Sequence, residues 1–474
     1  MSQTYKYLAG GKWQESSDVL EVINPFNDEV AGITYRAKGS DIEKSIQASV
    51  KAFDETRRLP SYKRAEILSN IRNGLVEGSE GLARMIALEA GKPITDSRRE
   101  VNRAIGVFQI ASEEAKRIGG EFIPLDLFEA SKGRVGINKR FPLGPILGIT
   151  PFNFPLNLAC HKIAPAIAAG NTIVIKPASK TPITALLLAE IVSQSGLPEG
   201  AFSVLPCSSD VAERMVKDDR FRMLTFTGSS AVGWRLKNIA GKKRVTLELG
   251  GNAGTIIDED ADLELATKRC VYGGFTFSGQ TCISLQRIYV HEKIYKRFLS
   301  DFVAQVTELK IGNPLDETTS IGPMFNINAA ERAGSWIKDA VKGGAKALTG
   351  GKRKGKIVEP TVLIDTNPDM KVNCEEVFAP VVTVTKFTSF EDALTQLNNT
   401  RYGLQASIFC NDIKKVFMAY NTIDVGGLII NDVPTYRMDH MPYGGTKESG
   451  MGREGIKYAI EEMTEPKLLV LNLL

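Results

Sequence analysis

The chain has 474 residues, of which 43% are hydrophobic and 24% charged, a composition typical of a globular protein with two or three domains. Its net charge of +4 is spread along the chain without a basic run longer than Lys352–Lys354, which argues against nucleic acid or an anionic membrane as the main partner. No apolar leader follows Met1, and prolines interrupt the most apolar stretch, residues 141–178, so we expect a cytoplasmic enzyme without a membrane span.

The N-terminal third is predicted to begin with strands and then to become helical. Tyr5–Trp13 is typical of a short hairpin. Apolar residues then recur every three or four positions, which predicts amphipathic helices over Ser40–Phe53, Tyr62–Gly91 and Thr95–Ile118.

From Gly170 onward, short apolar strands alternate with helices, which predicts a parallel, doubly wound α/β sheet. The predicted strands are Thr172–Lys176, Phe202–Leu205, Arg222–Phe226 and Arg244–Glu248, and the helices between them are Pro182–Ser195, Asp210–Lys217 and Ala231–Ile239. The C-terminal half repeats the alternation from Thr255 onward, which predicts a second α/β domain and places the hinge near Gly250–Gly254.

Cys282 is the best candidate for a reactive thiol among the six cysteines. The cysteines form no C-x-x-C pair and the chain has only three histidines, so we expect neither a disulfide framework nor a metal site. Cys282 follows the polar, glycine-bearing stretch Ser278–Thr281, whereas most free cysteines are small buried hydrophobes. A buried structural cysteine is the alternative for Cys282.

Glu248 closes a predicted strand and precedes Gly250 and Gly251. In a doubly wound sheet, ligands bind beyond the carboxyl ends of the strands, and glycines permit close approach of the backbone. This carboxylate is therefore expected to face the ligand crevice, where it could activate water. A solvated strand end is the alternative.

Two further segments carry candidate polar contacts. Gly228 and Ser229 lie between a strand and a helix, where free N–H groups could bind a pyrophosphate, although a plain N-cap explains Ser229 almost as well. Asn153 lies between Pro151 and Pro155, and its amide could stabilise an oxyanion or simply form a turn. The glycine motif Gly450–Gly455 follows no clear strand, so we reject it as a dinucleotide fingerprint.

These motifs together resemble the aldehyde dehydrogenase superfamily, and the resemblance covers essentially the whole chain in the right order. They are Pro-Phe-Asn153-Phe-Pro, Ile-Lys176-Pro-Ala-Ser, Glu248-Leu-Gly-Gly, Gly-Gln-Thr-Cys282 and Glu376-Val-Phe378-Ala-Pro. The resemblance implies a dinucleotide-binding domain from residues 1–120 and 140–250, and a catalytic domain from 251–453. It also implies a small β oligomerisation arm from 121–139 and 454–474, and a homodimer or homotetramer.

The resemblance also implies a role for each motif residue. Cys282 would be the nucleophile, Glu248 the general base, and Asn153 with the Cys282 N–H the oxyanion hole. The cofactor would be held by Lys176 and Ser179 at the adenine ribose, by Gly228 and Ser229 at the pyrophosphate, and by Glu376 and Phe378 at the nicotinamide. Relatives that transfer the acyl group to coenzyme A usually lack this glutamate, so we expect hydrolysis to a carboxylic acid.

The residues around the ribose site predict that NADP is accepted and preferred over NAD. Many NAD-dependent relatives carry a glutamate where Ser179 stands, and a carboxylate there would repel a 2′-phosphate. Lys176 and Lys180 add positive charge. The alternative is that Lys180 points into solvent and both cofactors work.

The substrate prediction is a small polar or anionic aldehyde. Segments 158–165 and 433–445 resemble the lactaldehyde, phosphonoacetaldehyde and sulfolactaldehyde dehydrogenase group. His161 and Thr276 stand where succinate-semialdehyde dehydrogenases usually carry arginines, which disfavours that alternative and leaves a glyceraldehyde-type enzyme as another. Arg103, His161, Arg287 and Arg437 are the candidate pocket residues, although each arginine could instead form a surface or interdomain ion pair.

A non-enzymatic relative is a further alternative, because structural crystallins also resemble this superfamily. Such a chain would be expected to lack one of the three catalytic residues, and Cys282, Glu248 and Asn153 are all present. An esterase activity through Cys282 alone is expected as a side reaction that needs no nucleotide.

Overall fold

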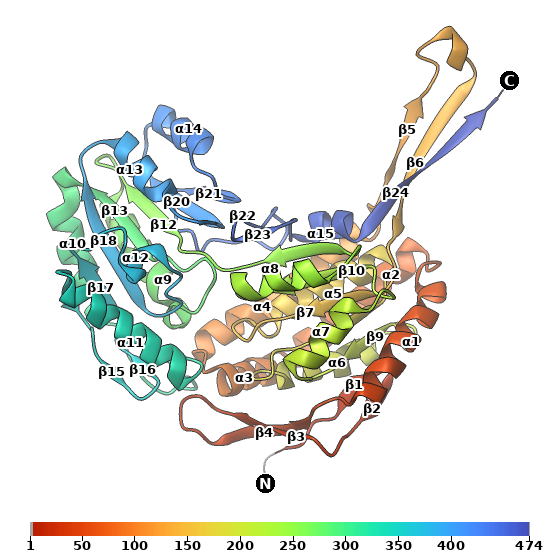
Figure 1. Cartoon of the computed structure of the whole chain (residues 1–474), viewed down its shortest axis with the longest axis horizontal. Helices are drawn as coiled ribbons and strands as arrows, with labels where there is room; N and C mark the ends of the chain where they lie inside the picture. The colour runs from red at the N-terminus through yellow and green to blue at the C-terminus, as the bar shows by residue number, and fades with distance from the viewer. Residues whose placement is uncertain (1–2, 474) are drawn as a thin grey trace.

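The computed structural model describes residues 3–473 and shows two α/β bodies with a three-stranded arm that projects from one of them (Figure 1). Each body is built round its own sheet. The chain leaves the first sheet after Glu248 and enters the second at Gly254, so the predicted hinge lies on the crossing between the bodies. Among the described helices, none is both long and apolar enough to cross a membrane.

The first body is an eight-stranded sheet in the order β2-β1-β9-β8-β7-β10-β11-β23. The five strands from β9 to β11 are parallel, and β1, β2 and β23 extend the edges in antiparallel pairings. The strands are β1 (Tyr7–Ala9), β2 (Lys12–Gln14), β7 (Ile146–Ile149), β8 (Ile173–Lys176), β9 (Phe202–Val204), β10 (Met223–Thr227), β11 (Arg244–Glu248) and β23 (Gly450–Met451). Strands β7, β8 and β10 are buried along their whole length, as parallel strands covered on both faces must be.

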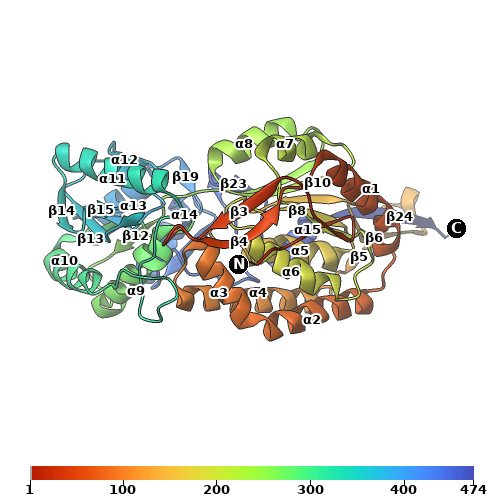
Figure 2. The same cartoon turned by 90° about the horizontal axis from the view of Figure 1, so that it is seen from below.

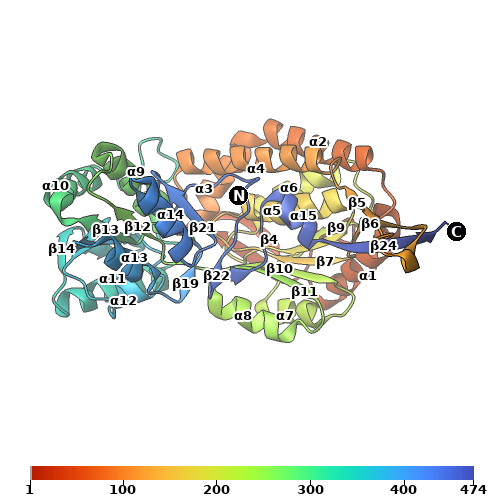
Figure 3. The same ribbon diagram turned by 90° about the horizontal axis from the view of Figure 1, so that it is seen from above.

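Helices cover both faces of this sheet. Figures 2 and 3 show α1, α7 and α8 on one side and α2 to α6 with α15 on the other. Their bounds are α1 (Gly39–Thr56), α2 (Ser61–Glu77), α3 (Ser79–Ala90), α4 (Ile94–Glu114), α5 (Asn157–Ala169), α6 (Ile183–Ser193), α7 (Ser209–Lys217), α8 (Ser230–Ile239) and α15 (Ile456–Glu462). The segment predicted as one helix over Tyr62–Gly91 is two helices, because the chain turns at Gly78.

The second body is a seven-stranded sheet in the order β14-β17-β18-β13-β12-β20-β21, parallel except for β14. Its strands are β12 (Gly254–Ile257), β13 (Arg287–His291), β14 (Lys346–Thr349), β17 (Thr361–Ile364), β18 (Val381–Phe387), β20 (Gln405–Phe409) and β21 (Gly427–Ile430). Its helices are α9 (Leu263–Phe275), α10 (Glu292–Thr307), α11 (Ile327–Lys342), α12 (Lys371–Cys374), α13 (Phe390–Asn398) and α14 (Ile413–Thr422).

The arm is the antiparallel sheet β24-β6-β5, formed by β5 (Gly120–Pro124), β6 (Arg134–Pro142) and β24 (Thr464–Asn472). The predicted tail boundary at residue 454 needs correction. Helix α15 packs on α4 and α5 of the first body because Ile456, Ala459 and Ile460 form its buried face, so the C-terminal part of the arm is β24 alone.

Short elements complete the chain. They are the pairs β3 (Val19–Ile23) with β4 (Val30–Tyr35), β15 (Arg353–Lys354) with β16 (Ile357–Val358) and β19 (Tyr402–Gly403) with β22 (Thr446–Lys447), and the 3-10 turns η1 (Glu129–Ser131) and η2 (Thr276–Gly279).

Candidate active site

Cys282 follows a turn whose backbone conformation is held by its surroundings. Phe277, Ser278 and Gly279 have φ angles of 47°, 55° and 69°, a left-handed conformation that non-glycine residues rarely adopt. The Ser278 hydroxyl donates a hydrogen bond to the Gly322 carbonyl at 2.9 Å. A run of three such residues persists only where packing determines it, and such runs are common at functional sites.

Two cavities meet at the Cys282 side chain. The smaller one, about 100 Å³, has walls from both bodies that include Arg103, Asn157, Phe277, Arg437 and Tyr443. The larger one, about 210 Å³, is lined by residues that include Asn153, Gly228, Ser229, Glu248, Glu376 and Phe378. The thiol can therefore face one ligand in the small cavity and another in the large cavity.

The thiol of Cys282 lies 3.1 Å from the hydroxyl of Tyr443. Burial raises the pKa of Cys282 to about 11, although the Tyr443 hydrogen bond and the Arg437 charge act in the opposite direction. The thiol is therefore mostly protonated at neutral pH, and the thiolate fraction increases as the pH rises.

Glu248 lies at the carboxyl end of β11, paired with Thr227 at the end of the parallel strand β10. The residue is 4% exposed, and neither carboxylate oxygen has a hydrogen-bond partner among the described residues. Burial and the neighbouring charge of Glu454 raise the pKa of Glu248 well above its ordinary value. Such a carboxyl group loses its proton and becomes a base only as the pH rises. Since it forms no structural ion pair with the described residues, its oxygens are free to accept a proton.

Asn153 lies in the loop between β7 and α5, and its side chain is oriented by the loop that carries Cys282. The Nδ2 atom donates a hydrogen bond to the Gln280 carbonyl at 2.9 Å, which leaves the second amide hydrogen for another acceptor. Glu100 accepts the N–H groups of Leu156 and Asn157 at the start of α5, which fixes the end of the Asn153 loop. An amide held in this way can donate to a developing oxyanion.

The larger cavity fits part of a dinucleotide. Ser229 is the N-cap of α8 but makes no side-chain capping bond, and the buried Ser230 hydroxyl has no partner among the described residues. Unused donors at the start of a ten-residue helix suit a pyrophosphate. Across the cavity, Glu376 accepts the Gly251 N–H at 3.2 Å and burial raises its pKa to about 7, while Phe378 lies at the same wall.

Lys176 and Ser179 lie outside the lining of the larger cavity, at the carboxyl end of β8. Strand β7 separates β8 from β10, the strand that leads to Ser229, so the two sites are about 10 Å apart by strand spacing. An extended dinucleotide can cross that distance along the carboxyl ends of the strands. Lys176 is buried and Lys180 is exposed.

Two of the four predicted substrate residues line the smaller cavity. Arg103 forms a two-point ion pair with Asp439, with N–O distances of 2.6 and 3.2 Å. Arg437 lies 3.0 Å from Glu454, and its guanidinium is 3.6 Å from the centre of the Tyr443 ring. The two guanidinium groups, brought together from residues 334 positions apart, give this cavity a cationic wall.

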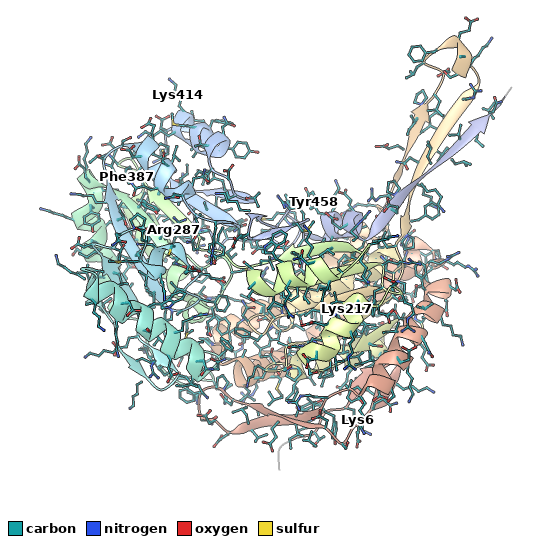
Figure 4. The ribbon with its side chains drawn as sticks, in the orientation of Figure 1. Lys6, Lys217, Arg287, Phe387, Lys414 and Tyr458 are labelled. Atoms are coloured by element: carbon teal, nitrogen blue, oxygen red, sulfur yellow. The ribbon has the colours of Figure 1, made fainter. Side chains whose placement is uncertain are left out.

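His161 and Arg287 are corrections, because neither belongs to the cavity wall. His161 is buried behind it, with Nε2 2.7 Å from Asp439, and burial with the Arg437 charge lowers its pKa, so the ring is neutral and orients Asp439. Arg287 starts β13 in the second body (Figure 4), where it donates to the carbonyls of Asn252 and Leu397 at 3.1 and 3.0 Å. Those backbone acceptors satisfy Arg287, and the structure places it outside the lining of the smaller cavity.

The sequence interpretation missed three side chains of this site: Tyr443, Asp439 and Glu454. Asp439 and Tyr443 lie in the Val433–Gly445 segment around Arg437, and Glu454 lies in the Gly450–Gly455 motif that is rejected above as a dinucleotide fingerprint. Burial opposes ionisation of Glu454, but Lys162 and Arg437 hold its pKa down at about 2. Asp439 and Glu454 pair with Arg103 and Arg437 without lining the smaller cavity themselves, so the cavity wall presents the two guanidinium groups.

Comparisons with known proteins identify the family of this chain. The model of the aldehyde dehydrogenase family matches residues 13–469. A 3-sulfolactaldehyde dehydrogenase of Priestia aryabhattai is 44% identical over 470 residues, covering 99% of this chain and 98% of the relative. A lactaldehyde dehydrogenase of Methanococcus aeolicus is 40% identical over 467 residues, covering 98% of this chain and 99% of the relative.

Two solved structures are similar over nearly the whole chain. Aldehyde dehydrogenase 21 of Physcomitrella patens, in complex with the reaction product succinate, is 45% identical with a TM-score of 0.99, covering 100% of this chain and 99% of that one. A glyceraldehyde-3-phosphate dehydrogenase of Methanocaldococcus jannaschii, complexed with NADP, is 39% identical with a TM-score of 0.92, covering 97% and 99%. With its two sheets, its arm and a cysteine at the junction of two cavities, the chain belongs to the aldehyde dehydrogenase family.

Proposed function

We propose that this NAD(P)-dependent aldehyde dehydrogenase oxidises a short polar or anionic aldehyde, lactaldehyde-like, to its carboxylic acid. The observation that carries the proposal is the small cavity beside Cys282, with Arg103 and Arg437 in its wall. At about 100 Å³ the cavity is smaller than a typical ligand pocket of about 300–1,000 Å³, which favours a short substrate. Guanidinium groups bind carboxylate, phosphonate or sulfonate through paired hydrogen bonds.

Cys282 is the proposed nucleophile. Its thiolate adds to the aldehyde carbon, the sulfur–carbon bond forms, and the carbonyl oxygen becomes an alkoxide. The free Nδ2 hydrogen of Asn153 and the Cys282 N–H are the proposed donors to that oxygen. Bound nicotinamide dinucleotide supplies the hydride acceptor, after which the acyl group remains on Cys282 as a thioester.

Glu248 is the proposed base for the second half of the reaction. It removes a proton from water, whose oxygen attacks the thioester carbon, and the carbon–sulfur bond breaks to release the acid and the thiolate. Glu248 lines the same cavity as Cys282 and has no ion-pair partner among the described residues, which supports this role. Hydrolysis rather than transfer to coenzyme A follows from that role.

NADP is the proposed preferred cofactor. Ser179 carries no negative charge, and Lys176 and Lys180 flank it at the end of β8. A 2′-phosphate on the adenine ribose would meet no carboxylate from Ser179 and would gain from the two lysines. Glu376 and Phe378 are the proposed contacts of the nicotinamide end.

The arm supports a proposed homodimer or homotetramer. Strand β24 is an edge strand, and Leu468, Leu469 and Val470 along it are 53%, 53% and 49% exposed. An uncovered apolar edge strand is a surface for pairing with another chain, and a second copy presents the same strand. We also propose a cytoplasmic location, since six unpaired cysteines suit a reducing compartment.

The test is formation of reduced nicotinamide by the purified enzyme, with NADP and NAD in parallel. Lactaldehyde, glyceraldehyde, phosphonoacetaldehyde and succinate semialdehyde are compared, with Cys282→Ser as control. We expect the highest kcat/KM with NADP and one of the short hydroxy or phosphonate aldehydes, and no turnover by the control. Activity on none of the four, with NADP still bound, would show the substrate assignment to be wrong.

Succinate semialdehyde is a specific second candidate. The 45% identical Physcomitrella patens enzyme was crystallised with succinate, and the cationic wall of the small cavity suits a second carboxylate equally well. A kcat/KM for succinate semialdehyde above that for lactaldehyde would favour this alternative. A glyceraldehyde preference would instead favour an activity like that of the NADP-bound relative.

Arg437→Lys separates the anion-binding proposal from general damage. Lysine keeps the charge beside Glu454 but loses the planar fork that matches an oxyanion. We expect the fall in kcat/KM to be about tenfold or more greater for the anionic aldehydes than for propanal, which has no anionic group. An equal loss on both kinds of aldehyde would contradict anion binding by this residue.

A further inference from the structure

The structure places a phenol directly on the reactive thiol. The hydroxyl of Tyr443 lies 3.1 Å from Sγ of Cys282, and Tyr443 is 2% exposed. This is the one hydrogen bond that the described residues make to the Tyr443 hydroxyl. A Tyr hydroxyl in such a position acts on the sulfur rather than on a structural partner.

Tyr443 is held in place through its backbone, its ring and its hydroxyl. Its backbone N–H donates to the Glu454 carbonyl at 3.1 Å, and the Glu454 backbone N–H donates to the Tyr443 carbonyl at 2.6 Å. Arg437 stacks on the ring at 3.6 Å and is held by the Glu454 carboxylate at 3.0 Å. The backbone, ring and hydroxyl of Tyr443 are therefore each held by a contact, to Glu454, Arg437 and Cys282 respectively.

The donor in the Tyr443–Cys282 bond depends on the state of the thiol. A protonated thiol can donate to the phenol oxygen, but once the thiol loses its proton only the phenol can donate. Burial and the neighbouring Cys282 raise the pKa of Tyr443 well above its ordinary value, so the phenol retains its proton where the thiolate forms. Hydrogen bonds to an ionised acceptor are stronger than those between neutral groups.

We propose that Tyr443 is a further catalytic residue, whose hydroxyl donates a hydrogen bond to the Cys282 thiolate and so increases its population in the free enzyme. The proposal rests on Cys282 as the nucleophile, but not on the identity of the aldehyde. Arg437 then has a second role besides anion binding, because its guanidinium stacks on the Tyr443 ring and keeps the phenol oriented toward sulfur.

Four charged or titratable groups act on the Cys282 thiol. Tyr443 and Arg437 favour the thiolate from the small-cavity side, whereas the charges of Glu376 and Glu248 oppose it from the large-cavity side. Tyr443 is the member of this group that contacts the sulfur by a hydrogen bond. Its removal should therefore reduce the thiolate population at a given pH.

The test is the pH dependence of Cys282 alkylation by iodoacetamide in the free enzyme, without aldehyde or nucleotide. Tyr443→Phe keeps the ring on which Arg437 stacks and removes only the oxygen. We expect the midpoint of the rate profile to rise by about one pH unit or more, which makes alkylation below the midpoint about tenfold slower. The limiting rate at high pH should not fall, since the thiolate itself is unchanged.

Tyr272→Phe is the matched control, since Tyr272 belongs to the same cavity wall and makes no hydrogen bond to the sulfur. Its alkylation midpoint should equal that of the wild type. An unchanged or lowered midpoint in Tyr443→Phe would overturn the proposal. Peptide mapping follows the label on the Cys282 peptide separately from that on the exposed Cys374, and a wild-type Cys282 peptide that stays unlabelled would instead mean failure of the Cys282 assignment.

Discussion

At the scale of single residues, the two proposed reactive groups are both neutral at rest. Burial raises the pKa of Cys282 to about 11, and burial with Glu454 raises the pKa of Glu248. Both groups become active by losing a proton, so the reaction should accelerate as the pH rises from neutral. Glu248 also makes the stability of the fold depend on pH, because burial disfavours the ionised form of its carboxyl group.

Glu248→Gln tests the base and its environment together. In the folded chain the Glu248 carboxyl group keeps its proton above the ordinary pKa of 4.5, whereas in the unfolded chain it loses the proton there. The wild type therefore loses stability as the pH rises from 4.5 toward the raised pKa, and Gln, which cannot ionise, removes this loss. We expect the melting temperature of the variant, relative to the wild type, to increase as the pH rises from about 5 toward the raised pKa. A difference that stays constant with pH would contradict the raised pKa.

The same variant should lose turnover but keep the first hydride transfer. Steady-state NADPH formation should fall about 10²- to 10⁴-fold, while a burst equal to the number of active sites remains. Rapid mixing separates the two phases. Sustained wild-type turnover by Glu248→Gln without coenzyme A would show that another group activates the water.

Ser179→Glu tests cofactor choice at a single position. A carboxylate there can accept a hydrogen bond from the ribose 2′-hydroxyl and repels a 2′-phosphate. We expect the ratio of kcat/KM for NADP to that for NAD to fall by on the order of tenfold or more. Ser179→Gln, of the same size without charge, is the control, and an equal fall in both variants would mean that size rather than charge is responsible.

At the scale of elements, the left-handed turn Phe277–Gly279 connects the end of α9 to the catalytic loop. A Cβ atom added to Gly279 would lie 2.2 Å from the Ala379 carbonyl oxygen, far inside van der Waals contact. The turn therefore requires glycine for its φ angle and for the space beside β18. Any shift here would move Cys282.

Gly279→Ala should reduce both stability and catalysis. The positive φ angle alone costs about 1–2 kcal/mol for a residue with a Cβ, and the clash with Ala379 adds to it. Gly241→Ala is the matched control, because Gly241 has a φ of 65° and nothing within 4 Å of the added Cβ. We expect both melting temperatures to fall, but kcat/KM to fall only in Gly279→Ala.

At the scale of the whole molecule, the active site is divided between the two bodies. Arg103 and Asn153 come from the first body and Cys282 from the second, with walls of the small cavity from both. The arm projects away from both bodies (Figure 1) and presents apolar residues along β24 that nothing in the described chain covers. We propose that the arm holds the subunits of the oligomer together.

Leu469→Asp tests the proposed assembly. A charge on a strand that pairs with a second copy should shift the mass in light scattering toward that of the 51.8 kDa chain. Val341→Asp, on α11 of the second body and 44% exposed, is the control and should leave the mass of the oligomer unchanged. A wild-type enzyme that is itself a monomer would refute the assembly proposal.

Local pattern in the sequence determined the alternation of strands and helices, because apolar spacing and turn residues act over a few positions. It also led to Cys282, Glu248 and Asn153, since each follows a short motif at the end of an element, and the structure gathers all three at one cavity. Tertiary packing alone decided which arginines reach the cavity. Arg103 and Arg437 converge there, whereas Arg287 is held by backbone carbonyls.

The contact between Tyr443 and Cys282 joins residues 161 positions apart and has no local signature. The same is true of the packing of α15 on α4 and α5, since residues 454–474 are predicted above to belong to the arm. Such pairings depend on how preformed elements dock, and docking is determined by the buried faces of both partners together. The sequence by itself therefore determined the chemistry of this protein, and only the tertiary structure decided which charged and phenolic side chains surround it.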